Sequence, residues 1–144
     1  MTQKVRVETA WLMLFAAWLV ALASTLGALF LGEVMGMTPC LLCWYQRIAV
    51  FPLAVILLLG LTPFDPGSIR YALPLAVIGW LIAAYHNLLF WDVVPEDLVQ
   101  CGQGASCKDA QIQVAGFLPI PLMSLIAFSL IIVLLLAVKA STRR

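Results

Sequence analysis

Four long apolar runs restrict what this chain can fold into. They extend roughly over residues 10–31, 41–61, 71–91 and 117–138. Each holds about twenty residues, which is the length of an α-helix that crosses the hydrocarbon core of a membrane at about 1.5 Å per residue. Lipid offers the backbone no hydrogen-bond partners, and barrel strands would be half as long with alternating polarity. The sequence therefore predicts an all-α membrane protein, a four-transmembrane-helix bundle.

Composition agrees with one integral membrane domain. Of 144 residues, 64% are hydrophobic and only 10% are charged, whereas soluble domains are far more polar. A net charge of +1 gives no basic field for nucleic acid, and there is no repeat or low-complexity linker. We expect a single domain over residues 1–144. Its helices are expected at about 10–31, 39–61, 71–91 and 116–138, with outward loops at about 32–38 and 92–115.

The first apolar run also has features of a secretory signal. Lys4 and Arg6 precede it, and Ala21-Leu22-Ala23 resembles a cleavage site. The run continues to Leu31, which is longer than a signal core, so we interpret it as a retained helix.

The basic residues predict the orientation. Six of the eight lie at the two termini or in the turn between the second and third runs, which predicts that both termini are cytoplasmic. Both cysteine pairs then lie on the opposite face, in an oxidising space. The basic residues in question are Lys4, Arg6, Arg70, Lys139, Arg143 and Arg144.

The first cysteine pair, Cys40 and Cys43, lies where the second helix is expected to begin. Thr38 is predicted as the N-cap and Pro39 as the first helical residue. The positive end of a helix lowers a cysteine pKa, so this placement favours a reactive dithiol. The alternative is a static bridge or a pair of packed thiols.

Arg47 follows this pair on nearly the same helix face, since positions 40, 43 and 47 are spaced i, i+3 and i+7. A cation inside an apolar run is costly and usually marks a site, here for a thiolate or for the oxygen of a bound electron acceptor. Snorkelling to the interface is the alternative. His86, the only histidine, lies at a comparable depth on the third helix, so a shared pocket is reasonable. A structural histidine is the alternative there.

The second pair, Cys101 and Cys107, lies in a loop rich in glycine and small residues. Such a loop is expected to be accessible, so that a disulfide in it could be attacked by a thiolate of another protein. A static clip is the alternative. Four cysteines allow three pairings, and the sequence does not choose among them.

Three segments carry a resemblance to a known family. In these segments the chain resembles the bacterial disulfide bond formation protein B (DsbB) family. The short C-x5-C loop, and Gln46 where the better-known branch carries an acid, make it most similar to the BdbC branch. The segments are Pro39-Cys40-Leu41-Leu42-Cys43-Trp44-Tyr45-Gln46-Arg47, the Cys101 to Cys107 loop, and Phe117-Leu118-Pro119-Ile120-Pro121.

The resemblance implies an oxidoreductase of the bacterial cytoplasmic membrane. It would reoxidise an extracytoplasmic thioredoxin-fold dithiol oxidase, similar to DsbA or BdbD, and pass the electrons to ubiquinone or menaquinone. Cys101 would form the mixed disulfide with the partner, and Cys107 would then attack Cys40. The shortened loop leaves this handover open.

For the inner pair, the resemblance implies that Cys43 is the thiolate facing the quinone. Arg47 would lie beside the quinone ring, and His86 matches a family position near it. A quinone is also the natural electron sink for a chain without a haem, flavin or metal-cluster motif. We expect it between helices one, two and three, near Arg47.

Three other functions remain to be weighed. A quinone reductase similar to vitamin K epoxide reductase also has four helices and C-x-x-C, although the segment from Trp44 to Arg47 and the C-x5-C loop favour the DsbB side. A zinc protein is disfavoured because the cysteine spacings are not those of a finger, so no metal ligands are expected. A structural membrane protein with two static bridges is the third.

Overall fold

The computed structural model describes residues 2–36, 39–91, 93, 113–114 and 118–143. In these ranges it has four long helices, α1 (Thr2–Leu29), α2 (Leu41–Leu61), α3 (Ile69–Phe90) and α4 (Ile120–Arg143). A π-helical turn, η1 (Phe30–Val34), extends α1, and a 3-10 turn, η2 (Pro66–Ser68), precedes α3. The two-residue strands β1 (Gln113–Val114) and β2 (Leu118–Pro119) pair antiparallel before α4.

The four helices are long and apolar enough to cross a membrane, over Lys4–Val34, Leu41–Leu61, Pro66–Phe90 and Ile120–Thr142. This confirms the predicted all-α bundle of four membrane-spanning helices. α1 begins before the predicted residue 10, because the helix continues through its charged first turns. α2 begins at Leu41, two residues after the predicted start at Pro39.

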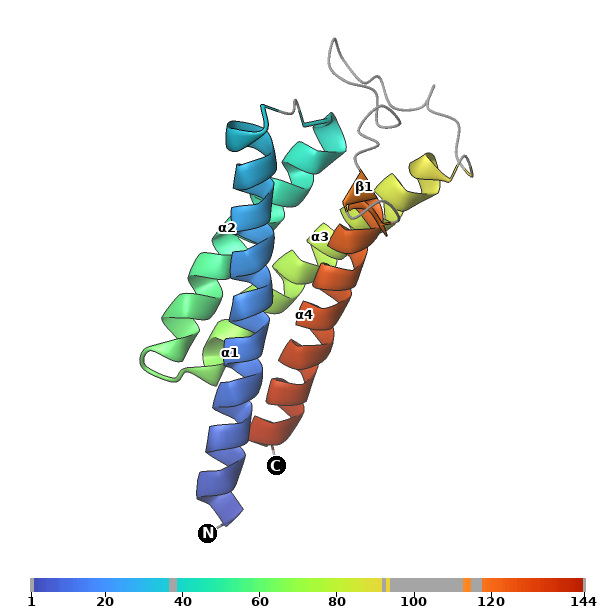
Figure 1. Cartoon of the computed structure of the whole chain (residues 1–144). Helices are drawn as coiled ribbons and strands as arrows, with labels where there is room; N and C mark the ends of the chain where they lie inside the picture. The colour runs from blue at the N-terminus through green and yellow to red at the C-terminus, as the bar shows by residue number, and fades with distance from the viewer. Residues whose placement is uncertain (1, 37–38, 92, 94–112, 115–117, 144) are drawn as a thin grey trace.

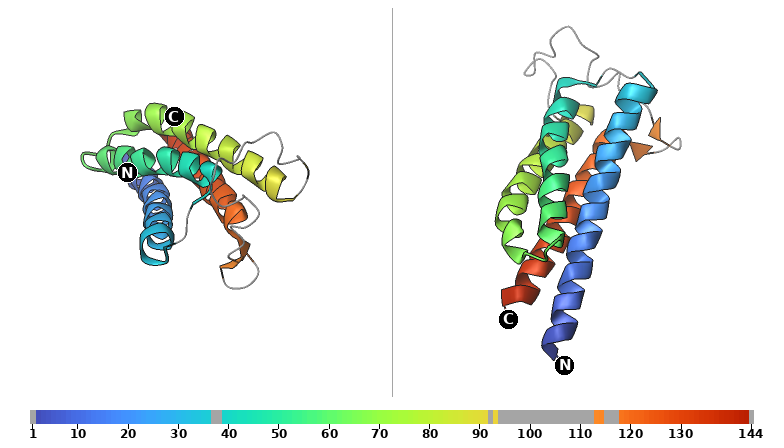
Figure 2. Two further views of the ribbon diagram at one scale, coloured as in Figure 1. Left: turned by 90° about the horizontal axis from the view of Figure 1, so that it is seen from above. Right: turned by 90° about the vertical axis from the view of Figure 1, so that its left-hand side faces the viewer.

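The helices form a ring in which α1 packs against α2 and α4, and α3 packs against the same two helices. Figure 1 shows the start of α1 and the end of α4 at one end of the bundle, and η1 and the start of α2 at the opposite end. Seen from above, α2 and α3 lie side by side, and α1 and α4 spread away from each other on one side of them (Figure 2). The loop that the sequence predicts at 92–115 lies almost wholly outside the described residues.

Small side chains allow the helices to approach closely. The fully buried residues of α1 are Ala10, Leu14, Ala17 and Ala21, at spacings of four, three and four. Such i, i+3, i+4 stripes of small and apolar residues are typical of packing between membrane helices, where close van der Waals contact drives association. The equivalent stripe of α3 is Ala72, Ala76, Gly79 and Ala83.

α3 and α4 approach each other closely at Gly79. A Cβ atom added there would overlap the ring of Phe128 on α4. Phe128 itself is 3% exposed, so its ring fills the space that the glycine leaves. The glycine therefore sets the distance between the two helices below the level of the cysteine pair.

Candidate functional site

Cys40 is the N-cap of α2. Its backbone is extended (φ −66°, ψ 165°), and its Sγ accepts a hydrogen bond from the backbone N–H of Cys43 at 3.4 Å. Its carbonyl accepts from the N–H of Trp44 at 3.1 Å. The predicted N-cap, Thr38, lies outside the described residues, and the prediction of Pro39 as the first helical residue was wrong. The sulfur takes the position that a serine oxygen takes in a capping box, where the N-cap side chain binds the N–H three residues on.

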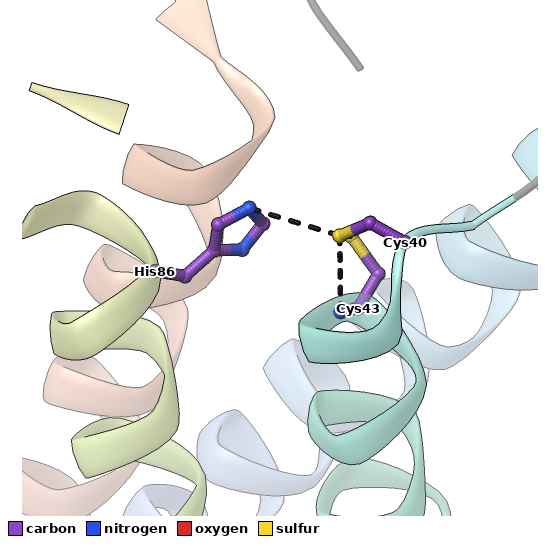
Figure 3. A group of neighbouring side chains, drawn as sticks. All are labelled: Cys40, Cys43 and His86. Carbon is purple, nitrogen blue, oxygen red and sulfur yellow. Dashed lines mark hydrogen bonds between the residues drawn. The ribbon is translucent and has the colours of Figure 1, made fainter. Parts of the chain in front are cut away.

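This capping explains why C-x-x-C suits a helix start. The N-cap residue and the third helical residue face each other, so the Sγ atoms of Cys40 and Cys43 lie 2.8 Å apart. A disulfide can form between them with little movement. Figure 3 shows both cysteines at the first turn of α2, facing His86 on α3.

His86 completes a three-residue group with this pair. Its Nε2 lies 3.8 Å from Cys40 Sγ. Cys40 and His86 are 2% and 1% exposed, so the contact is removed from water. His86 continues the inward stripe of α3, three residues after Ala83, and this register directs the imidazole at the start of α2.

The environment of Cys40 favours its thiolate. Cys40 precedes the membrane-spanning segment of α2, which begins at Leu41. The side-chain hydrogen bond with Cys43, reinforced by His86, lowers the pKa of Cys40 to about 4, although burial acts in the opposite direction. The positive end of the α2 dipole, together with the N–H of Cys43 that binds the sulfur, favours the same charge.

Gln46 contacts the second ring nitrogen of His86, the one that faces away from Cys40. Its Nε2 lies 3.2 Å from His86 Nδ1, and its side chain is 8% exposed. When the amide nitrogen donates to Nδ1, the ring proton lies on Nε2 and can be donated to the Cys40 sulfur. The sequence analysis used Gln46 only to choose a branch of the family. Its spacing from Leu42, Leu53 and Leu57, which form the buried face of α2, was the signal that it points inward.

Arg47 turns toward α1. Its Nη2 donates to the carbonyl oxygen of Ala28 at 2.7 Å, and its guanidinium carbon lies 5.6 Å from the centre of the Trp44 ring. A Cβ added at Gly32 would lie 3.1 Å from both terminal nitrogens of Arg47. Gly32 belongs to η1, and single π-turns of this kind are frequent at functional sites. The π-turn and its glycine thus make room for a cation within the bundle.

A cavity of about 370 Å³ lies beside these groups. Its polar lining comes mainly from α2 and α3, and α4 contributes Ser124, Phe128 and Ile131 among others. The sequence-predicted residues Cys40, Cys43, Arg47 and His86 all line it, as does Gln46. The cavity is walled by α1, α2 and α4, with His86 as its lining residue from α3, whereas the sequence analysis expected the quinone between helices one, two and three. Cys101 and Cys107 lie outside the described residues.

Comparison with known proteins identifies the family. The family model described as "Disulfide bond formation protein DsbB" matches residues 8–138, which is nearly the whole chain. The chain belongs to the DsbB family. It is therefore a membrane-spanning thiol oxidoreductase that generates disulfides, and the DsbB family membership decides against a vitamin K epoxide reductase-like or purely structural protein.

Individual members of the DsbB family agree with the predicted branch. The chain is 46% identical over 133 residues to a "Probable disulfide formation protein" of Metapseudomonas resinovorans, covering 92% of each chain. It is 41% identical over 130 residues to "Disulfide bond formation protein C" of Bacillus subtilis, covering 88% of this chain and 91% of that one. No solved structure matches the chain.

Proposed function

We propose that this chain is a thiol:quinone oxidoreductase. It reoxidises an extracytoplasmic thioredoxin-fold dithiol oxidase through Cys101 and Cys107, and passes the electrons through Cys40 and Cys43 to a membrane quinone. The observation that carries the proposal is the position of the C-x-x-C pair in the wall of an apolar cavity, next to a buried histidine and a cation.

The cavity fits a quinone head group in size and chemistry. Its volume of about 370 Å³ lies at the lower end of the range of small-molecule sites, which combine an apolar lining with a few placed polar groups. Arg47 would hold the ring through its guanidinium N–H groups, and His86 would lie beside the ring, since both line the cavity. A quinone bound there would supply the acceptor for two electrons and two protons.

The thiol–disulfide exchanges balance in electrons and bonds without any further reactant. The two thiols of the partner become a disulfide, and a Cys101–Cys107 disulfide takes their two electrons and becomes a dithiol. Thiolate exchange then moves the pair of electrons to Cys40 and Cys43. Each exchange forms one S–S bond and breaks another.

Within the inner pair, the roles follow from position. Cys40 faces His86, which suits it to be the sulfur that Cys107 attacks, with Cys43 leaving as a thiolate. Cys40 itself leaves as a thiolate in the next exchange, when Cys101 attacks Cys107 and re-forms the loop disulfide. Cys43 is half-buried and also lines the cavity, which suits it to be the sulfur nearer the acceptor. His86 and Gln46 keep a proton available at Nε2 for the departing Cys40 thiolate.

Orientation in the bacterial cytoplasmic membrane follows from the distribution of charge. Lys4, Arg6, Arg70 and Lys139 lie in the helix ends opposite to the start of α2. Because basic loops stay in the cytoplasm, both termini are assigned to the cytoplasm and the cysteine pairs to the outer side.

The test measures quinone reduction by the purified full chain in detergent, with a reduced thioredoxin-fold oxidase as electron donor. Cys40→Ser and Cys43→Ser should each abolish turnover. Thr62→Ser, at the far end of α2, is the control for a conservative change on the same helix. Full turnover in either cysteine variant would refute the proposal.

The loop pair is tested by trapping. Cys107→Ser should accumulate a mixed disulfide between the partner and Cys101, because the thiol that resolves it is gone. Accumulation through Cys107 in a Cys101→Ser variant would reverse the two roles.

A further inference from the structure

The reduced inner pair and His86 form a compact group of soft donor atoms. The two sulfurs and an imidazole nitrogen all lie within 4.8 Å of one another. They come from two helices, α2 and α3, so the group is formed by the packing of the bundle and not by local sequence alone. This explains why the cysteine spacings in the sequence gave no metal motif.

The donor set matches d10 divalent cations. Zinc binds thiolate sulfur at about 2.3 Å and imidazole nitrogen at about 2.0–2.1 Å, which in a tetrahedron separates sulfur from nitrogen by about 3.6 Å. The distance from Cys40 Sγ to His86 Nε2 is 3.8 Å. The sulfurs, at 2.8 Å, must move apart by about 1 Å, which a rotation of the half-buried Cys43 side chain provides. Hard cations such as magnesium prefer oxygen and are not suited.

Charge also favours such a cation. Two thiolates carry two negative charges, so a divalent cation bound by them gives a neutral complex in an apolar cavity. A neutral complex adds no repulsion against Arg47, which lines the same cavity.

Gln46 provides the outer support that metal-binding histidines usually have. Its amide contacts Nδ1 of His86 at 3.2 Å, and its oxygen can accept the Nδ1 proton once Nε2 binds a metal. The fourth coordination position faces the cavity, because both cysteines and the histidine line it. Three protein ligands with one open position is the arrangement of reactive zinc sites.

We propose that reduced Cys40 and Cys43, together with His86, form a binding site for zinc or cadmium that the oxidised pair does not offer. A cation bound there occupies both thiolates and keeps the pair reduced. The effect of this cation on turnover rests on the proposed function, whereas the binding of the cation to the reduced pair does not. By mass action, free metal at about 100 times its dissociation constant leaves only about 1% of the reduced protein able to react.

The experiment uses the full chain with Cys101→Ser and Cys107→Ser, so that only the inner pair can bind metal. The protein is reduced, freed of reductant without oxygen, and titrated with Cd²⁺ and separately with Co²⁺. We expect a thiolate-to-metal absorption band that saturates at one equivalent, with tetrahedral bands in the visible spectrum for Co²⁺. The oxidised protein should give no band.

Variants locate the site. Cys43→Ser should lose the band, and Gln46→Leu should bind about 10- to 100-fold more weakly with the same spectrum. His86→Ala should bind the metal at least as weakly as Gln46→Leu does, and it should change the visible Co²⁺ spectrum because a ligand is lost. Tyr85 is next to His86 in the sequence but is not a proposed metal ligand. Tyr85→Phe is therefore the matched control and should bind the metal as tightly as the parent.

Three results would overturn the inference: no saturating band in the reduced parent, equal binding by the oxidised protein, or an unchanged band and affinity in His86→Ala. Turnover of the unsubstituted chain, measured without metal, is independent of these results. A band without turnover would refute the proposed function alone, and turnover without a band would refute this inference alone. Where both hold, Cd²⁺ should stop turnover and a chelator should restore it.

Discussion

At the scale of single residues, the site depends on one side chain having two roles. Cys40 closes the N-terminus of α2 and is also one of the two sulfurs proposed to exchange disulfides. As the cap, it accepts the N–H of Cys43, and the same contact places the two sulfurs together. A negative sulfur is a better acceptor than a neutral one, so helix formation and thiolate formation support each other. The pair is thus already shaped for a disulfide before any partner binds.

The lowered pKa of Cys40 predicts a thiolate at unusually low pH. In the reduced Cys101→Ser/Cys107→Ser protein, the Cys40/Cys43 pair should release one proton with an apparent pKa of about 4. A lowered pKa means that the thiolate persists as the pH falls, so the ultraviolet absorbance of one thiolate should stay constant from about pH 8 to pH 5. Ordinary cysteines lose it below about pH 8.5. Cys43→Ala removes the hydrogen bond that lowers the pKa of Cys40 most, so this pKa should rise. Absence of a thiolate at pH 6 in the reduced protein would contradict the prediction.

A second prediction at this scale concerns Gln46. Gln46→Leu leaves Nδ1 of the buried imidazole without its partner, at a cost of about 1–3 kcal/mol. The ring is expected to avoid this cost by turning away from Cys40, so kcat/KM for quinone reduction should fall about 5- to 150-fold. Tyr45→Phe, an exposed neighbour on α2, is the control for a change that leaves the imidazole contact intact. Wild-type kcat/KM in Gln46→Leu would show that the amide does not position His86.

At the scale of elements, the site is made by helix ends. The first turn of α2, the last turn of α3 and the π-turn after α1 each contribute one group: the cysteine pair, His86, and the space for Arg47. The sequence predicted the helices, the place of the C-x-x-C pair at the start of α2 and the shared pocket of Arg47 and His86, since these depend on apolar length and local spacing. The reactivity of the pair stays a prediction. It did not predict Cys40 as the cap, the contact of Gln46 with His86, or the wall from α4. Those depend on how the helices are rotated against one another, which no single segment encodes.

The π-turn gives a prediction of its own. Gly32→Ala would place a methyl group 3.1 Å from the guanidinium nitrogens of Arg47, tighter than ordinary contact, and should push the cation from its place beside Ala28. A loss of about 0.5–1.5 kcal/mol corresponds to a KM for quinone that is about 2- to 10-fold higher, with kcat less affected. Val34→Ala, exposed in the same turn, tests whether the turn itself is the cause. Equal KM values in Gly32→Ala and the parent would refute a positioning role for Gly32.

At the scale of the whole molecule, the bundle separates two chemical environments along its axis. The cysteine pair Cys40/Cys43 and His86 lie at the end where α2 begins, and the basic residues of α1, α3 and α4 lie at the other. Between them, α1 and α3 pack through stripes of small residues and α3 meets α4 at Gly79. The exposed apolar side chains face outward along the helices, as expected of surfaces in contact with lipid. Because the helices pack closely, His86 Nε2 is held 3.8 Å from the Cys40 sulfur.

This polarity predicts which end of the bundle faces the outside of the cell. Two single-cysteine proteins are made after all four native cysteines are replaced by serine: Glu33→Cys, exposed in η1, and Thr142→Cys, exposed near the end of α4. Because the basic end should remain in the cytoplasm, a membrane-impermeant maleimide should label Glu33→Cys in intact spheroplasts of a bacterial host. Thr142→Cys should be labelled only after lysis, which serves as the control for expression and reactivity. Labelling of Thr142→Cys in intact spheroplasts, with Glu33→Cys protected, would place the cysteine pairs in the cytoplasm and leave the proposed extracytoplasmic partner without access to them.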